Sequence, residues 1–148
     1  MQTVIFFIVI LFSTTVSFAQ KQIPRINHVA FSVIDVKKSS MFYREIMGLD
    51  TIPEPFHDGR HAWFSIGEHS QLHVVQNPPP IVVPPKGLHL CFSVPDMNGF
   101  IAMLQQKKIH YEDLRGNPSS ITTRPDGVHQ IYFQDPDGYW LEINDDNK

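Results

Sequence analysis

The stretch His28-Val29-Ala30-Phe31-Ser32-Val33 returns later in the chain as His89-Leu90-Cys91-Phe92-Ser93-Val94. Both copies run histidine, aliphatic residue, small residue, Phe, Ser, Val. An internal repeat is considered first because it decides the architecture. After one intervening residue each copy is followed by an aspartate, Asp35 or Asp96, and aspartate is a favoured N-cap of a helix. We therefore expect two copies of one unit, each beginning with a strand that leads into a helix.

Side chains alternate between the two faces of a β-strand. In the first copy this places the three large apolar residues on one face and His28 on the other, beside two small residues. The second copy divides in the same way, with His89 on its less apolar face. Each unit thus begins with a strand that can pack one face against a helix and present a histidine on the other.

A chain of 148 residues suits one domain, or two small modules that share a core. The hydrophobic fraction of 42% is ordinary for a globular protein, and the net charge of −3 comes without a basic run. This charge pattern argues against nucleic acid or a membrane surface as a partner of the mature chain. A small-molecule partner is the expectation.

The first 19 residues differ from the rest. An apolar run covers Val4–Phe12, and Ser17-Phe18-Ala19 matches a small-x-Ala cleavage site. This pattern predicts a secretory signal peptide over residues 1–19, cleaved near Ala19-Gln20, and hence export to the periplasm or the exterior. The segment has no Lys or Arg before the apolar run, so an uncleaved membrane anchor is the alternative.

Residues 20–146 are predicted to form one α+β domain of two tandem βαβββ modules. Module one, residues 24–77, has expected strands at Ile26–Val33, Asp50–Ile52, Arg60–Ile66 and Gln71–Gln76, with a helix from Asp35 to a left-handed cap at Gly48. Module two, residues 87–146, has expected strands at Leu88–Val94, Ile109–Glu112, Val128–Phe133 and Tyr139–Asn144, with a helix capped by Asp96. Five prolines between residues 78 and 86 predict a semi-rigid linker.

The closing strands of the two modules also correspond. Leu72-His73-Val74 matches Leu141-Glu142-Ile143, and alternation places His73 and Glu142 opposite their apolar neighbours. If helices cover the apolar faces, these two side chains point to the same concave side as His28 and His89. Any one of the four, taken alone, is more often an ordinary strand residue. Their equivalent places in two repeats indicate a metal site.

Three imidazoles and one carboxylate suit a divalent transition ion: Zn, Ni, Co, Mn or Fe(II). A four-ligand set in an octahedral field leaves positions open for substrate, as in catalytic metal sites. Cys91 shares the face of His89, and a small strand residue is its first interpretation, with a ligand or nucleophile as the alternative. Six further residues are candidates for lining a substrate pocket: Arg60, His61, Trp63, Arg124, His129 and Trp140. For the two histidines ordinary strand surface is the alternative, and for the tryptophans core packing.

Five segments between Pro24 and Asn144 carry a resemblance to the vicinal oxygen chelate superfamily, which includes glyoxalase I, extradiol dioxygenases, fosfomycin-resistance enzymes and bleomycin-resistance proteins. They are Ile26-Asn27-His28-Val29-Ala30, Phe42-Tyr43-Arg44-Glu45-Ile46-Met47-Gly48-Leu49, Gln71-Leu72-His73-Val74-Val75-Gln76, Gly87-Leu88-His89-Leu90 and Phe133-Gln134-Asp135-Pro136-Asp137-Gly138-Tyr139-Trp140-Leu141-Glu142-Ile143. The resemblance implies two βαβββ modules forming a curved, partly closed mixed sheet around a metal cavity. It also implies a homodimer, with the modules paired within one chain or across two.

Residue by residue, the resemblance makes His28, His89 and Glu142 metal ligands. The fourth ligand of glyoxalase I is a glutamate, and this chain has His73 in that place. The first hypothesis is therefore a metal-dependent, glyoxalase I-like lyase or isomerase acting on vicinal oxygens. Glu142 is its expected proton carrier, because a ligated imidazole is a poor base. The alternatives are extradiol dioxygenase chemistry, thiol transfer to an epoxide, and a non-catalytic binding module like the bleomycin-resistance proteins.

Overall fold

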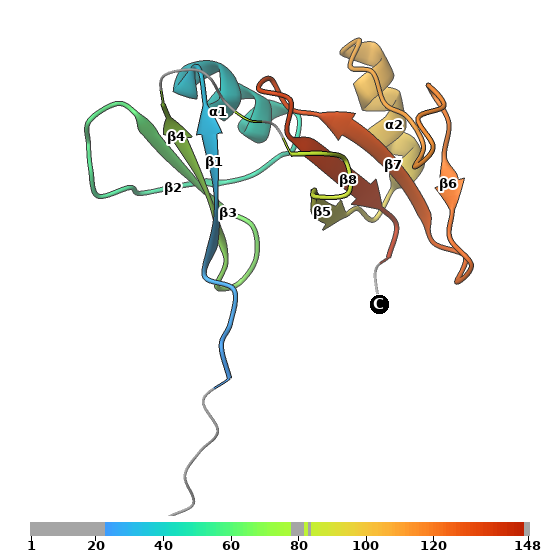
Figure 1. Cartoon of the computed structure of the whole chain (residues 1–148), viewed down its shortest axis with the longest axis horizontal. Coiled ribbons are helices and arrows are strands. Elements are labelled where there is room, and N and C mark those ends of the chain that lie inside the picture. The colour runs from blue at the N-terminus through green and yellow to red at the C-terminus, as the bar shows by residue number, and fades with distance from the viewer. Residues whose placement is uncertain (1–22, 78–81, 83, 147–148) are drawn as a thin grey trace, which may run out of the picture.

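The computed structural model describes residues 23–77, 82 and 84–146 (Figure 1). The predicted signal peptide lies outside the described residues, as does part of the predicted linker, so both stay predictions. Within the described part of the chain, no helix has the length and apolar character needed to cross a membrane.

The elements follow the order βαβββ twice. They are β1 (His28–Val33), α1 (Val36–Glu45), β2 (Thr51–Ile52), β3 (His61–Ser65), β4 (Gln71–Gln76), β5 (Leu90–Ser93), α2 (Met97–Gln106), β6 (Thr122–Thr123), β7 (His129–Gln134) and β8 (Trp140–Asn144). Each module forms its own four-stranded mixed sheet, in the orders β1-β4-β3-β2 and β5-β8-β7-β6. The first and last strands of each module pair in parallel. The predicted fold class is confirmed.

Local sequence explains where the helices begin and end. The side chain of Asp35 accepts hydrogen bonds from Lys37 N at 2.9 Å and Lys38 N at 3.1 Å, and Asp96 accepts from Gly99 N at 2.9 Å. Both predicted N-caps are therefore confirmed. After α1 the chain turns at Gly48, whose φ of +66° is a conformation that glycine adopts without a side-chain clash.

Two strand predictions in module two were wrong. Ile109–Glu112 is not a strand, and Glu112 makes only isolated bridges to Pro118 and Tyr132. The second strand of this module is β6, in a segment where we had predicted no strand. A strand of two residues is too short to produce an alternating pattern, so the sequence carried no signal for it.

One apolar core joins the two modules. It includes Phe64 and Leu72 from module one and Ile131, Leu141 and Ile143 from module two, all fully buried. These residues lie on the strand faces opposite the four predicted ligands. The shared core is therefore built from the apolar faces of both sheets.

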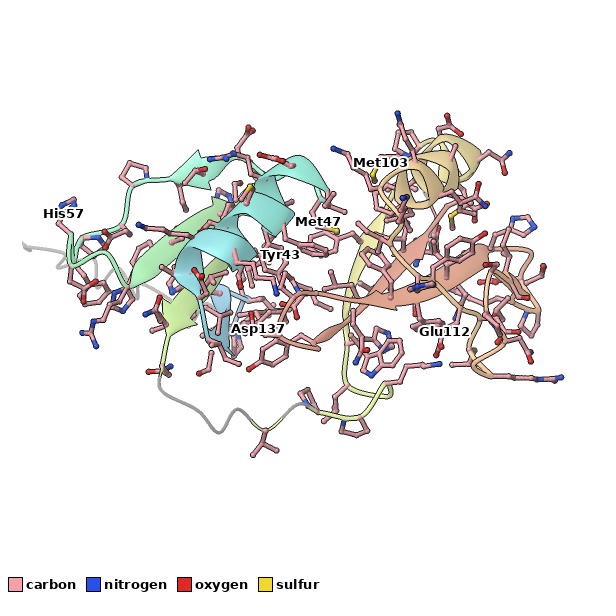
Figure 2. The ribbon with its side chains drawn as sticks, turned by 90° about the horizontal axis from the view of Figure 1, so that it is seen from above. Tyr43, Met47, His57, Met103, Glu112 and Asp137 are labelled. Carbon is pink, nitrogen blue, oxygen red and sulfur yellow. The ribbon has the colours of Figure 1, made fainter. Side chains whose placement is uncertain are left out.

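The turn between β7 and β8 holds module two against module one. Tyr43 donates from its hydroxyl to Asp135 Oδ2 at 2.6 Å, and Asp137 accepts from Ser39 Oγ at 2.6 Å and Ile34 N at 2.7 Å. Figure 2 shows Tyr43 on α1 and Asp137 at the junction of the modules. Burial and the adjacent Asp135 carboxylate raise the pKa of Tyr43 far above its usual range. The Asp-Pro-Asp-Gly segment thus fixes the relative position of the two halves.

Candidate metal centre

Module one presents a stack of three parallel rings. The rings of His28 and His73 lie 4.2 Å apart with an interplanar angle of 7°, and the ring of Trp63 lies 3.9 Å from His73 at 1°. The register explains this arrangement, because Trp63 pairs directly with His73 on β3. On β1 the residue that pairs with His73 is Ala30, and His28, two residues earlier, lies on the same face. Imidazole lone pairs lie in the ring plane, so the lone pairs of stacked rings do not converge. An ion held by both histidines requires one ring to turn.

Hydrogen bonds show which ring nitrogen carries the lone pair in His28 and in His73. His28 Nδ1 lies 2.7 Å from Asn27 Oδ1, an acceptor, so Nδ1 donates and Nε2 carries the lone pair. His73 Nε2 lies 2.8 Å from Gln71 Oε1, which leaves the lone pair on Nδ1. Burial, followed by the nearby imidazoles of His28 and His61, lowers the pKa of His73. A neutral imidazole is the form that binds metal.

Module two presents a carboxylate beside an imidazole. His89, which directly precedes β5, has Nδ1 2.8 Å from the carbonyl oxygen of Lys86, so Nδ1 donates. Its Nε2 then faces Glu142 Oε2 at 3.1 Å. Two neighbouring ligands of an ion with bonds of about 2.1 Å lie roughly 3 Å apart. The two atoms are therefore spaced to share a cation.

The Glu142 carboxylate is anchored by three donors. Tyr132 donates from its hydroxyl to Oε2 at 2.6 Å, while Asn144 Nδ2 at 3.1 Å and Cys91 Sγ at 3.3 Å donate to Oε1. Burial raises the pKa of Glu142, but these hydrogen bonds and the charge of His89 outweigh it, and the pKa lies below its ordinary value. Glu142 is thus kept ionised in a fixed orientation.

Cys91 belongs to the Glu142 cluster as a proton donor. Burial, together with its hydrogen bond to Glu142, raises the pKa of the Cys91 thiol to about 12. A thiol with such a pKa is protonated at neutral pH and is a poor nucleophile. The small-residue interpretation of Cys91 is favoured.

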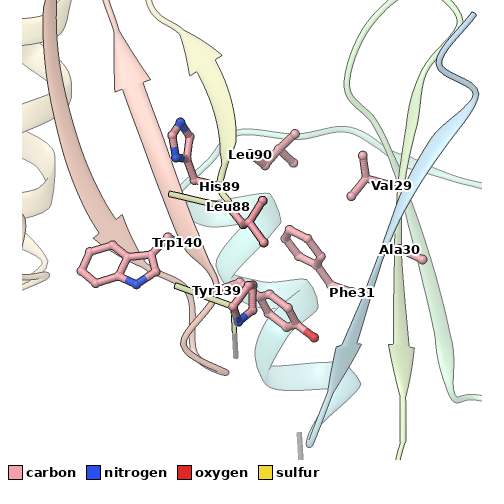
Figure 3. Close-up of a pocket in the computed structure, with 9 residues that line it drawn as sticks. Val29, Ala30, Phe31, Leu88, His89, Leu90, Tyr139 and Trp140 are labelled. Carbon is pink, nitrogen blue, oxygen red and sulfur yellow. The ribbon is translucent and has the colours of Figure 1, made fainter. Parts of the chain in front are cut away.

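The chain brings His28 to His73 and His89 to Glu142, and it leaves these two pairs apart. Among the described residues, no group of three or more His, Cys, Asp or Glu side chains could hold a metal ion. Between the modules is an open cavity of about 360 Å³ (Figure 3), lined by Val29, Ala30, Phe31, Pro84, Leu88, His89, Leu90, Tyr139 and Trp140. Strands β1 and β5 face each other across this cavity without pairing, and each is an edge strand of its sheet.

Both predicted pocket tryptophans lie on the ligand faces. Trp63 belongs to the ring stack, and its indole Nε1 is buried without a hydrogen-bond partner in the described residues. Trp140 shares the face of Glu142 and lines the cavity, with Lys86 Nζ 4.7 Å from its ring centre. Lys86 thus makes a cation–π contact with Trp140, and its ammonium group also pairs with Glu112.

His61 and His129, both predicted to line the pocket, do not lie at equivalent places in the two modules. The register pairs Trp63 with His73 and Tyr132 with Glu142, so Gln130 corresponds to His61. His129 lies on the opposite face of β7, and its Nδ1 contacts Asp145 Oδ2 at 2.8 Å. Both histidines follow a Gly-x-His pattern, but module two has one additional residue before the aromatic position. A one-residue offset reverses the face of a strand residue.

The two candidate arginines are engaged by neighbouring aspartates. Arg60 donates to Asp58 Oδ2 from Nε at 3.1 Å and from Nη2 at 2.9 Å. Arg124 pairs with Asp126, and that hydrogen bond is the main cause of the raised pKa of Arg124, with Glu142 a lesser contributor.

Sequence reasoning missed Tyr132, Asn144, Lys86 and Asp58, all of which contact a predicted site residue. Tyr132 and Asn144 could have been found by extending the alternation from Glu142 along β7 and β8. Lys86 and Asp58 lie in irregular segments, where no periodic signal exists.

The chain matches the profile of the Glyoxalase/Bleomycin resistance protein/Dioxygenase superfamily over residues 25–143. The chain belongs to this superfamily. Among its relatives, metallothiol transferase FosB of Staphylococcus epidermidis is 27% identical over 133 residues, which cover 83% of this chain and 82% of that protein. Glyoxylase I 4 of Arabidopsis thaliana is 27% identical over 124 residues, covering 80% and 68%. The solved structure of oxidase ChaP-H2 superposes with a TM-score of 0.69 at 26% identity, covering 82% of this chain and 92% of that one.

Proposed function

We propose that this protein is a metal-dependent enzyme that acts on a small substrate through two vicinal oxygens and isomerises it by proton transfer, as a glyoxalase I-like lyase or isomerase. The observation that supports it most strongly is the 3.1 Å approach of His89 Nε2 and Glu142 Oε2. Each of these groups has its remaining polar atoms held by donors or acceptors from the chain. Such pre-oriented donors fit a divalent ion: Zn, Ni, Co, Mn or Fe(II).

His28, His89 and Glu142 are the proposed ligands, and His73 is the fourth once its ring turns out of the stack. The ion supplies Lewis-acid polarisation of the substrate oxygens. Our sequence analysis made Glu142 the proton carrier as well. Both of its carboxylate oxygens are held by hydrogen bonds from Tyr132, Asn144 and Cys91, so we now assign it to the ligand set alone.

A homodimer completes the site in this proposal. The two ligand pairs lie on different modules, and the apolar faces of both modules are used in a core that they share within the chain. Module one of one chain can then meet module two of another. The edge strands β1 and β5, whose outer edges pair with no other strand in the described chain, would form the seam between the two copies.

Metal content tests the proposal. The full chain, purified without chelator, should hold about one transition ion per chain by mass spectrometry, and His89→Ala should lose it. An ion-free protein that also ignores added Zn, Ni, Mn and Fe would contradict the enzyme hypothesis and favour a binding module.

Mixing two inactive variants tests the dimer. His28→Ala damages module one and His89→Ala damages module two, so each variant alone should bind no ion. When they are unfolded together and refolded, sites shared between chains regenerate one intact site in each mixed dimer. Sites formed within a chain would regenerate none. The recovered metal content therefore distinguishes the two pairing modes.

Thiol transfer to an epoxide is the second candidate. The similarity to metallothiol transferase FosB favours it. In the assembled site that we propose, His28, His89 and Glu142 would make a three-ligand set that does not need His73. Mass spectrometry of a thiol and fosfomycin incubated with the metal-loaded protein would detect the adduct. We also propose export, which N-terminal sequencing would test by finding a mature chain that begins at Gln20.

A further inference from the structure

We propose that His61, oriented by Asp58, carries the proton in the isomerisation, and that the substrate is an α-hydroxy ketone with an aromatic substituent. This inference rests on the proposed function. It answers a question that the ligand assignment raises: with His73 and Glu142 engaged as ligands, the chain needs another base close to the metal centre.

Asp58 fixes one nitrogen of His61. Asp58 Oδ1 lies 2.8 Å from His61 Nδ1, and it also accepts from Arg60 N at 2.9 Å. The hydrogen bond from His61 and those from Arg60 hold the pKa of Asp58 well below its usual range. Asp58 is therefore an acceptor, and His61 Nδ1 must donate to it.

The other nitrogen of His61 is available. With Nδ1 protonated, Nε2 of the neutral ring carries the lone pair. Among the described residues, Nε2 has no hydrogen-bond partner, and the side chain is 14% exposed. An imidazole held by a carboxylate at Nδ1 and free at Nε2 is the arrangement used for general-base catalysis in several unrelated folds.

His61 lies on the ligand face of module one. It is two residues before Trp63 on β3, so the two side chains share a face, and Trp63 stacks directly on His73. Asp58, Arg60 and His73 are near it, and Lys37 and Arg44 of α1 line a surface pocket together with it. His61 is thus beside the proposed ligands without being one of them.

The proton transfer balances without another reactant. Nε2 takes the proton from the carbon that bears the hydroxyl, and the C–H electron pair forms a carbon–carbon double bond as the carbonyl oxygen gains negative charge. Asp58 stabilises the resulting imidazolium. The proton of the original hydroxyl passes to the former carbonyl oxygen, and the oxygen that it leaves becomes the new carbonyl oxygen. Nε2 returns its proton to the former carbonyl carbon, and the product is an isomer of the substrate.

Phe56 supports the aromatic substituent. Its ring stacks on His61 with centroids 4.3 Å apart and stands edge-on to Trp63 at 6.2 Å. It is 57% exposed, so one side remains free to contact a ligand. Glu54 holds the Phe56 loop in place by accepting from Phe56 N at 2.6 Å and His57 N at 2.9 Å. The base therefore has an aromatic wall beside it.

The experiment uses the metal-loaded full chain and 2-hydroxyacetophenone in heavy water. Proton NMR follows loss of the CH₂ signal as deuterium enters. We expect exchange faster than with the free ion, a loss of about 100-fold in His61→Asn and a loss of about 10-fold in Asp58→Asn. Metal content should be unchanged in both. His69→Asn removes an exposed loop histidine and should exchange like the native protein.

A second measurement, of the imidazole tautomer, does not depend on catalytic activity. Nitrogen-15 NMR of the labelled imidazoles should show His61 as the Nδ1–H form, and Asp58→Asn should shift it toward the other tautomer. The inference is overturned if His61→Asn exchanges at the native rate, if it loses its metal, or if the metal-loaded native protein shows no exchange above the free ion. A native protein without metal would instead overturn the proposed function.

Discussion

Modules one and two place chemically different groups on the same scaffold. At the position equivalent to Glu142, module one has His73, and at that of Tyr132 it has Trp63. Module one consequently forms a stack of parallel rings, whereas module two forms a hydrogen-bonded cluster around a buried carboxylate. These two exchanges, imidazole for carboxylate and indole for phenol, replace hydrogen bonding by ring stacking at equivalent places in the two sheets.

The two modules therefore supply different parts of the proposed site. Module two supplies a fixed negative charge, whose hydrogen-bond donors are in place before any ligand arrives. Module one supplies neutral nitrogens and an aromatic surface. A site assembled from one module of each kind has an anionic side for a cation and an apolar side for a substrate.

The largest loss of metal affinity should come from a substitution that makes module two resemble module one. Glu142→His removes the anchored carboxylate and leaves the hydroxyl of Tyr132 without its acceptor. Zinc affinity, measured by calorimetry, should fall by more than about 100-fold. Glu45→His, an exposed change on α1, is the matched control and should bind normally. Equal affinities in both variants would remove Glu142 from the ligand set.

The reverse change makes module one resemble module two and should raise the metal affinity. His73→Glu places a second carboxylate opposite the first and produces the ligand pattern that glyoxalase I has. Zinc affinity should rise about 10-fold, because an added negative charge favours the divalent ion. His73→Gln is uncharged and should not raise it. An affinity that falls in His73→Glu would show that the ring stack matters more than the charge.

Tyr132→Phe should weaken module two in a pH-dependent way. The folded-state pKa of Glu142 lies below its ordinary value of 4.5, so its contribution to stability is present above that pH and is lost as the pH falls through the folded pKa. Removing the Tyr132 hydroxyl raises this pKa and should cost about 1–2 kcal/mol at pH 7.

Urea unfolding of the metal-free protein at pH 7 and pH 4 measures the Tyr132 effect. The loss of unfolding free energy should be larger at pH 7, because at pH 4, below the ordinary value of 4.5, the unfolded carboxylate is largely protonated and part of the contribution is already lost. Tyr111→Phe, whose hydroxyl accepts from Gln105, should show no such difference. An equal loss at both pH values for Tyr132→Phe would mean that its hydroxyl does not act through the Glu142 charge.

The smallest effect is expected at Cys91. Because its pKa is raised to about 12, the thiolate fraction at pH 8 is about 1,000-fold below that of an ordinary thiol. Iodoacetamide should label the native protein far more slowly than the urea-unfolded protein, and Cys91→Ala should change zinc affinity less than about 3-fold. Rapid labelling of the native protein would place Cys91 among the reactive groups.

The sequence by itself determined the repeated βαβββ plan, the helix caps at Asp35 and Asp96, and the placing of His28, His73 and Glu142 opposite the apolar faces. These are local properties: capping and alternation depend only on neighbouring residues. Membership of the superfamily follows from the same segments, which the profile match covers.

The tertiary structure decided how those residues meet. His73 is stacked between His28 and Trp63, and Glu142 accepts hydrogen bonds from residues of two other strands. His129 lies on the face opposite Tyr132, because module two has one additional residue before the aromatic position. The tertiary structure also packed the two modules on a shared core and kept their ligand pairs apart among the described residues. Ring geometry, strand register and module placement depend on contacts between residues distant in the chain, which no local pattern encodes.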